Sequence, residues 1–201
     1  MFTSIPSLDS ILQCLLPVFT EPSFRTHVEI LLGWVMCLSK RTEYGVFQTI
    51  QADAPVSRQE RHPFDRFYNF FSRSSWMVPD LARQVAVAVV VRLNPSGLLY
   101  LVVDDTLLHK RGKKVYGLGW FRDAVASTAK RVATASGNHW VVVGLAICIP
   151  KTDKIYCLPI HAKLHLAGKN QKSEATLARE MLGDILEWFP DRKLVFLGDG
   201  A

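Results

Sequence analysis

The sequence has no closely spaced cysteines, and its first residues do not have the pattern expected of a secretory leader. Its four cysteines, Cys14, Cys37, Cys148 and Cys157, form no C-x-x-C pair, the spacing typical of zinc ribbons and dithiol redox sites. The N-terminal apolar residues follow no basic segment, so they do not resemble a signal peptide. Together these absences predict reduced thiols and a cytoplasmic protein.

Long hydrophobic runs are also missing. The most apolar stretch, QVAVAVVVRLNPSGLLYLVV (84–103), is interrupted by Arg92, Asn94 and Pro95. Neither half reaches the roughly 20 apolar residues that a membrane-spanning helix needs. We therefore expect a soluble protein with no membrane partner.

Charge of neither sign dominates the chain. The 24 basic and 18 acidic residues give a net charge of +6 and a pI near 9.3, an excess that many proteins carry without a polyanionic partner. A chain of 201 residues, 49% of them hydrophobic, can form one large domain or two small ones. The position of the positive charge is more informative than its sum, because much of it falls between residues 109 and 131.

The first part of the chain has the periodicity of helices. Thr26 and Glu29 have the spacing of a capping box, which predicts a helix that begins there. A further helix is predicted to bury one aromatic face, formed by Phe64, Phe67, Tyr68 and Phe71. We expect residues 1–93 to form a helical N-terminal region that is a candidate for DNA binding.

From residue 94 onward the pattern becomes that of an α/β domain. Apolar runs at 98–103, 140–149 and 154–160 predict strands, and the last two form an antiparallel hairpin. A helix is predicted from Ser173 to Phe189, capped by Ser173 and buried along Leu177, Met181, Leu182, Ile185 and Trp188.

The fourth predicted strand, KLVFLGD (193–199), follows that helix. A helical crossover returns the chain to pair in parallel with an earlier strand. If that strand is the first, Asp199 comes close to Asp104 or Asp105 at one edge of the sheet, where ligand sites of such sheets lie.

The segment LYLVVDDTLLHKRGKK (99–114) places acids directly before bases. Carboxylates at neighbouring strand ends raise each other's pKa unless cations neutralise them, and their hard oxygens suit Mg²⁺ or Mn²⁺. Such ions can activate a water or a 3′-hydroxyl for phosphodiester transfer. The alternative is that Asp-Asp-Thr begins a turn, with Asp105 bonded to local backbone N–H groups.

The bases that follow are candidates for contact with a phosphate backbone. These candidate DNA-binding residues are His109, Lys110, Arg111, Lys113 and Lys114, extended by Lys130 and Arg131. Binding through them would be sensitive to salt, because each neutralised phosphate releases counterions. An ordinary solvated loop is the alternative.

The histidines are not predicted to bind metal. His139 precedes Trp140 at a strand start, which favours packing or hydrogen bonding. His161 and His165 have the i, i+4 spacing that suits a metal only on a helix, and AKLHLAG (162–168) is too short to form one.

Three segments taken together resemble a known family. VVDDTLLHKRGKKVYGLGWFRDAV (102–125), GNHWVVVGLAICIP (137–150) and KLVFLGDGA (193–201) are similar to the catalytic domain of bacterial insertion-sequence transposases of the DDE superfamily. The resemblance implies a ribonuclease-H-like mixed sheet over residues 94–201 and metal-dependent DNA strand cleavage and transfer. It further implies Mg²⁺ or Mn²⁺ as cofactor, transposon-end DNA as partner and a homo-oligomer on DNA.

The resemblance also assigns site residues. Asp105 matches the first catalytic, metal-binding aspartate of the family, with Asp104 as a competitor, and Asp199 matches the second. The third member, a glutamate, follows the second aspartate in the family, whereas this chain stops at Ala201. Three glutamates of the predicted helix, Glu174, Glu180 and Glu187, precede Asp199, so none matches it.

This departure from the family pattern leads to two expectations. The first is a truncated transposase copy with an incomplete sheet, which is inactive alone. The alternative is a non-catalytic remnant that binds DNA without cutting it. A haloacid-dehalogenase-like phosphatase is disfavoured, because it needs an acid two residues after its nucleophile, where Thr106 and Leu107 stand here.

Overall fold

The computed structural model describes residues 6–38, 42–53, 64–148, 154–168 and 171–198. The chain divides into two compact units, Met1–Gln84 and Val85–Ala201. Helix α5 (Val78–Leu93) runs across this division, and its second half packs in the core of the second unit through Ala86 and Val90. The predicted boundary after residue 93 falls at the end of this helix.

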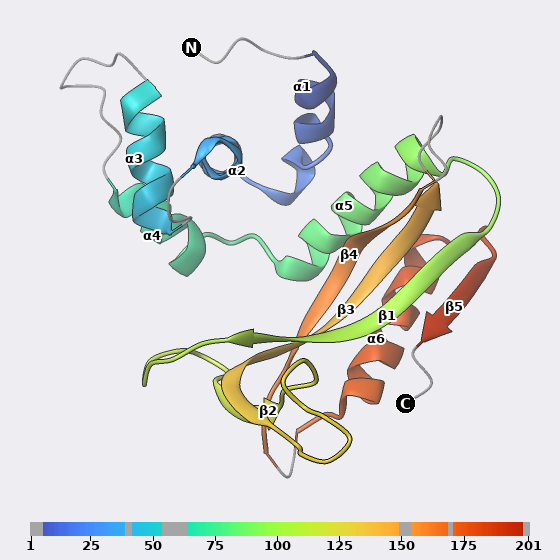
Figure 1. The fold of residues 1–201 in the computed structure, drawn as a ribbon. Coiled ribbons are helices and arrows are strands. Elements are labelled where there is room, and N and C mark those ends of the chain that lie inside the picture. The colour runs from blue at the N-terminus through green and yellow to red at the C-terminus, as the bar shows by residue number, and fades with distance from the viewer. Residues whose placement is uncertain (1–5, 39–41, 54–63, 149–153, 169–170, 199–201) are drawn as a thin grey trace. The chain divides into compact units, whose positions relative to one another are not determined.

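The first unit is helical. Its helices before α5 are α1 (Pro6–Gln13), the short 3-10 helix η1 (Leu16–Val18), α2 (Glu21–Met36), α3 (Glu43–Asp53) and α4 (Asp65–Ser72) (Figure 1). The prediction that a helix begins at Thr26 is wrong. Helix α2 begins at Glu21, more than one turn earlier, and Pro22 fits its first turn because proline is tolerated there. Thr26 is buried within the helix, where its Oγ1 donates to the Pro22 carbonyl oxygen at 2.9 Å.

The aromatic face of α4 differs from the predicted one. Phe67 and Phe70 are buried with Ile30 of α2 and with apolar side chains of α3. Tyr68 and Phe71, which were predicted to be buried, are exposed. Both sets have helical spacing, so periodicity alone did not decide which side of this aromatic-rich helix meets its neighbours.

The second unit is built on a mixed sheet that follows the helices, which confirms the predicted α/β class. Its strands are β1 (Leu99–His109), β2 (Gly119–Arg122), β3 (Thr134–Cys148), β4 (Ile155–His165) and β5 (Leu194–Gly198). The order is β4-β3-β1-β5, and β2 pairs with the beginning of β3. β1, β3 and β4 pair antiparallel, whereas β5 pairs in parallel with β1, as predicted.

Helix α6 (Glu174–Trp188) packs against one face of this sheet (Figure 1). Its predicted cap is confirmed, since Ser173 Oγ accepts a hydrogen bond from the Thr176 backbone N–H. Its predicted stripe is also confirmed: Leu177, Met181 and Ile185 are buried, and Leu182 and Trp188 are partly buried. Side chains alternate along a strand, so Leu99, Leu101 and Val103 of β1 meet this core and Asp105 follows on the same face.

Strand β1 is longer than its apolar run. It continues through Asp104 and Asp105 to His109, paired with β3 throughout. The acids therefore lie within a strand, and the alternative that they begin a turn is wrong. β4 likewise extends to His165, so the first residues of AKLHLAG are strand. In the described part of the chain, every helix is too short or too polar to span a bilayer.

Candidate active site

A cavity of about 280 Å³ opens where β1 and β5 run in parallel next to the beginning of α6. Its lining residues come from β1, β3, α6 and β5 and are Val103, Asp104, Asp105, Val141, Glu174, Ala175, Ala178 and Gly198. Three acidic residues thus line one cavity, two from adjacent positions of β1 and one from the first position of α6.

Asp104 and Asp105 project to opposite faces of the sheet, as adjacent strand residues do. Asp105 lies on the α6 face, where its Oδ2 is 2.6 Å from Nε2 of His139, and its side chain is 54% exposed. Asp104 Oδ1 accepts a hydrogen bond from the Asp105 backbone N–H at 2.9 Å. The α6 face therefore presents Asp105, whose second carboxylate oxygen is not used by His139.

Asp199 lies outside the described residues. The residue before it, Gly198, is the last of β5 and pairs with Val103, the residue before Asp104. The first and last strands therefore lie side by side in the sheet, as predicted. The position of the Asp199 carboxylate stays a prediction.

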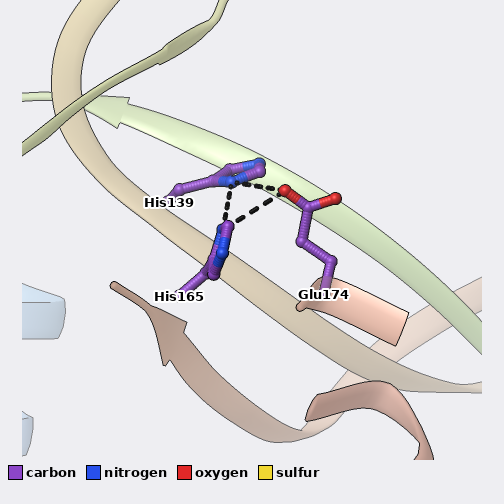
Figure 2. A group of neighbouring side chains, drawn as sticks. All are labelled: His139, His165 and Glu174. Carbon is purple, nitrogen blue, oxygen red and sulfur yellow. Dashed lines mark hydrogen bonds and ion pairs between the residues drawn. The ribbon is translucent and has the colours of Figure 1, made fainter. Parts of the chain in front are cut away.

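Two histidines and one glutamate, His139, His165 and Glu174, form a group (Figure 2). The group adjoins Asp105 through the contact of His139 with that carboxylate. His139 of β3 and His165 of β4 face each other across the two strands, with 3.2 Å between their Nδ1 atoms. Glu174 Oε1 lies 3.1 Å from His139 Nδ1 and 3.2 Å from His165 Nδ1. The side chains of His139 and His165 are only 7% and 18% exposed, and the Phe121 ring packs against both.

Sequence reasoning missed this group. It placed His139 in a packing or hydrogen-bonding role, which its contact with Asp105 agrees with, but it did not predict a metal ligand. It discounted His165 because no helix carries it. In a strand, however, residues four apart also share a face, and His165 shares the α6 face with His161. The signal that could have revealed the group is this strand alternation combined with an acid at the first turn of the following helix.

The predicted basic residues begin where β1 ends. His109, Lys110 and Arg111 line a second cavity of about 480 Å³ together with Trp120 of β2. His109 Nε2 lies 2.9 Å from Asp123 Oδ2. A hydrogen bond from the Ala126 backbone N–H lowers the pKa of Asp123, and although desolvation by burial opposes it, the contact with His109 lowers the pKa further. This acid therefore stays charged beside the bases.

The remaining predicted basic residues, Lys113, Lys114, Lys130 and Arg131, are exposed. They belong to two segments that both border the beginning of β3. The backbone N–H of Lys110 donates to Ser136, and that of Asp123 donates to Ala133. The two segments therefore present their charge at the same end of the sheet.

The architecture is that of a mixed sheet in which β1, paired in parallel with β5, carries two carboxylates near exposed bases. A family model described as DDE superfamily endonuclease matches residues 14–201, and the chain belongs to that family. Membership supports a transposase- or nuclease-type function with DNA as substrate, and endonucleases of this superfamily use divalent metals. No curated protein and no solved structure matches the chain.

Proposed function

We propose that this chain carries a metal-dependent centre for DNA strand cleavage and transfer, in which Asp105 and Asp199 hold Mg²⁺ or Mn²⁺. The observation that supports the proposal is a cavity lined by both Asp105 and Gly198, the residue that precedes Asp199. Asp104 is the weaker candidate because it projects to the face opposite α6.

The side chains at this cavity fit a hard divalent cation. Carboxylate oxygens are the preferred ligands of Mg²⁺ and Mn²⁺, and Asp105 keeps one oxygen beyond the Oδ2 that meets His139. When bound, such a cation polarises the phosphoryl group and lowers the pKa of an attacking water or 3′-hydroxyl.

His139 orients the carboxylate of Asp105. Its ring is buried, and a short contact of 2.6 Å joins Nε2 to Oδ2. A carboxylate that is fixed by a buried partner presents its other oxygen in one direction, which is the preorganisation that metal-dependent catalysis requires. His139 is therefore a positioning residue for Asp105.

The basic residues at the end of β1 fit the role of holding DNA beside this centre. Lys110 is five residues beyond Asp105, which is roughly 17 Å at the rise of an extended strand. That distance spans several phosphates of a nucleic-acid backbone. Contacts of this kind position the DNA without reading its sequence.

The proposal is tested by nicking of supercoiled plasmid in Mn²⁺. Asp105→Asn is expected to lower the nicking rate by about 100-fold or more, because it removes a ligand charge, and Asp104→Asn by less. The exposed Asp191→Asn is the matched control. Nicking that persists in Asp105→Asn contradicts the proposal, and DNA binding without any nicking supports the non-catalytic alternative instead.

A second test concerns the DNA-binding residues. The double variant Lys113→Ala with Lys114→Ala is expected to lower the slope of log K against log salt by about 2. Lys193→Ala is the control, since Lys193 is exposed and lies beside Leu99 at the other end of β1. An unchanged slope in the double variant removes this segment from the DNA interface.

A further inference from the structure

The ligand atoms of His139, His165 and Glu174 form a nearly equilateral triangle. Its sides are 3.2 Å between the two Nδ1 atoms, 3.1 Å from His139 Nδ1 to Glu174 Oε1 and 3.2 Å from His165 Nδ1 to the same oxygen. In a tetrahedral site with metal–ligand bonds of about 2.0–2.1 Å, two ligand atoms lie about 3.3–3.4 Å apart. The triangle therefore has nearly the size of one face of such a site.

The tautomer of His139 also indicates a cation at this position. Its Nε2 faces Asp105 Oδ2, and a charged carboxylate can only accept, so Nε2 carries the ring proton. In the neutral ring, Nδ1 then turns a lone pair toward Glu174 Oε1, which is a second acceptor. Two acceptors at 3.1 Å repel each other unless a proton or a metal cation lies between them.

The contact between Asp105 and His139 has the form of an outer-shell interaction. Metal-binding histidines usually donate their other ring N–H to a carboxylate, which fixes the tautomer and strengthens the ligand. Here Nε2 meets Asp105, and Nδ1 is turned toward His165 and Glu174. His139 is therefore tautomerically arranged to bind metal through Nδ1.

We infer that His139, His165 and Glu174 bind one zinc-class transition-metal ion. Two imidazole nitrogens and one carboxylate are a donor set of zinc sites that keep a fourth position open. The mixed nitrogen and oxygen set also separates this ion from Mg²⁺, which prefers oxygen ligands only. The inference goes beyond the proposed function and does not depend on it.

Such an ion would connect three elements at one point. His139 lies in β3, His165 at the end of β4 and Glu174 at the beginning of α6. It would tie the first turn of α6 to the sheet, and through His139 it would hold the carboxylate of Asp105. The ion is thus a positioning element for the cavity beside it.

The test is titration of the EDTA-treated, dialysed chain with Zn²⁺, by calorimetry and by metal analysis of the protein. One equivalent is expected to bind. Glu174→Gln and His165→Ala are each expected to weaken binding by about 100-fold or more, since each removes a ligand. Glu187→Gln, an exposed glutamate of the same helix, is the matched control with unchanged affinity.

A second pair of variants tests the outer-shell contact. Asp105→Asn is expected to weaken Zn²⁺ binding by about 10–100-fold, the usual effect of losing an outer-shell partner. Asp104→Asn, one residue away and on the other face of the sheet, is expected to leave it unchanged. Far-ultraviolet circular dichroism of each variant verifies the fold, and Glu174 is exposed, so its variant is expected to fold.

Two results would overturn the inference: no stoichiometric zinc in the wild-type chain, or wild-type affinity in both Glu174→Gln and His165→Ala. Either would leave a hydrogen-bonded group without metal. The readout contains no DNA, so its failure is distinct from that of the proposed function. Nicking that persists in Asp105→Asn would remove the nuclease proposal and leave the zinc result standing.

Discussion

Two histidine–carboxylate clusters join α6 to the sheet, and they are built differently. In the first, the Lys163 cluster, His161 Nε2 lies 3.0 Å from Asp184 Oδ2, and Lys163 Nζ lies 3.2 Å from the same oxygen and 3.4 Å from Glu180 Oε2. In the second, the Glu174 cluster of His139, His165 and Glu174, the carboxylate meets two imidazole nitrogens.

The difference lies in the source of positive charge. Lys163 supplies a permanent cation to its cluster, so its carboxylates are neutralised by the chain itself. In the Glu174 cluster the described contacts place His139 between two acids, Asp105 and Glu174, and His165 beside Glu174. Similar residue types on one helix–sheet interface thus produce two different results. The Lys163 cluster is an ion-pair network that contains its own permanent cation, whereas the described contacts of the Glu174 cluster include no permanent cation.

The largest effect on stability is expected from a substitution in α6 that removes apolar packing shared by both clusters. Ile185 of α6 is fully buried, so Ile185→Ala is expected to lower the free energy of unfolding by about 2–5 kcal/mol through lost burial and a cavity. Urea unfolding measures it. Leu186→Ala, at a half-exposed position of the same helix, is expected to cost far less, and equal losses would contradict the packing described for α6.

A smaller effect separates the clusters in metal-free protein. Asp184→Asn is expected to lower the free energy of unfolding by about 0.5–1 kcal/mol, since it weakens partly exposed contacts to His161 and Lys163. Glu174→Gln is expected to change it by less than about 0.5 kcal/mol, because the amide can donate to an imidazole lone pair. A larger loss in Glu174→Gln would mean that the cluster is stable without metal.

The smallest effect is a pH dependence in the Lys163 cluster. Partial burial raises the pKa of Asp184, but hydrogen bonds from His161 and Lys163 outweigh it, so the net pKa is lowered. A carboxyl whose pKa is lower in the folded chain stabilises it above the usual value of about 3.9, and this contribution is lost as pH falls through the folded pKa.

The stability difference between wild type and Asp184→Asn should therefore shrink as the pH falls below the usual carboxyl pKa of about 3.9. Urea unfolding at successive pH values measures it, with Asp191→Asn as an exposed control. A difference that grows as the pH falls below about 3.9 would give Asp184 the opposite role.

Strong local patterns predicted much of the second unit. The stripe of α6 and its serine cap are visible at helical spacing, and the apolar runs mark parts of β1, β3, β4 and β5. The parallel pairing of β5 with β1 followed from chain connectivity. These features depend on residues near one another in the sequence or on general rules of topology.

The ends of the strands could not be predicted from the sequence, because they depend on pairing partners that are distant along the chain. Asp105 continues a strand because Val141 pairs with it, and His165 because His139 does. Neither polar residue has a local preference for that conformation. The Glu174 cluster was missed for the same reason, since its members meet only after β3, β4 and α6 are assembled.

We propose that the edge of the sheet at Asp105 binds a divalent cation next to the end of β5. Crystals of the chain grown with Mn²⁺ test it most directly, through anomalous scattering at the manganese edge. We expect an anomalous peak for one manganese ion that is bound by the Asp105 carboxylate, with Asp199 as the second ligand of the ion. A map without manganese at Asp105, or with manganese bound only by Asp104 on the opposite face, would contradict it.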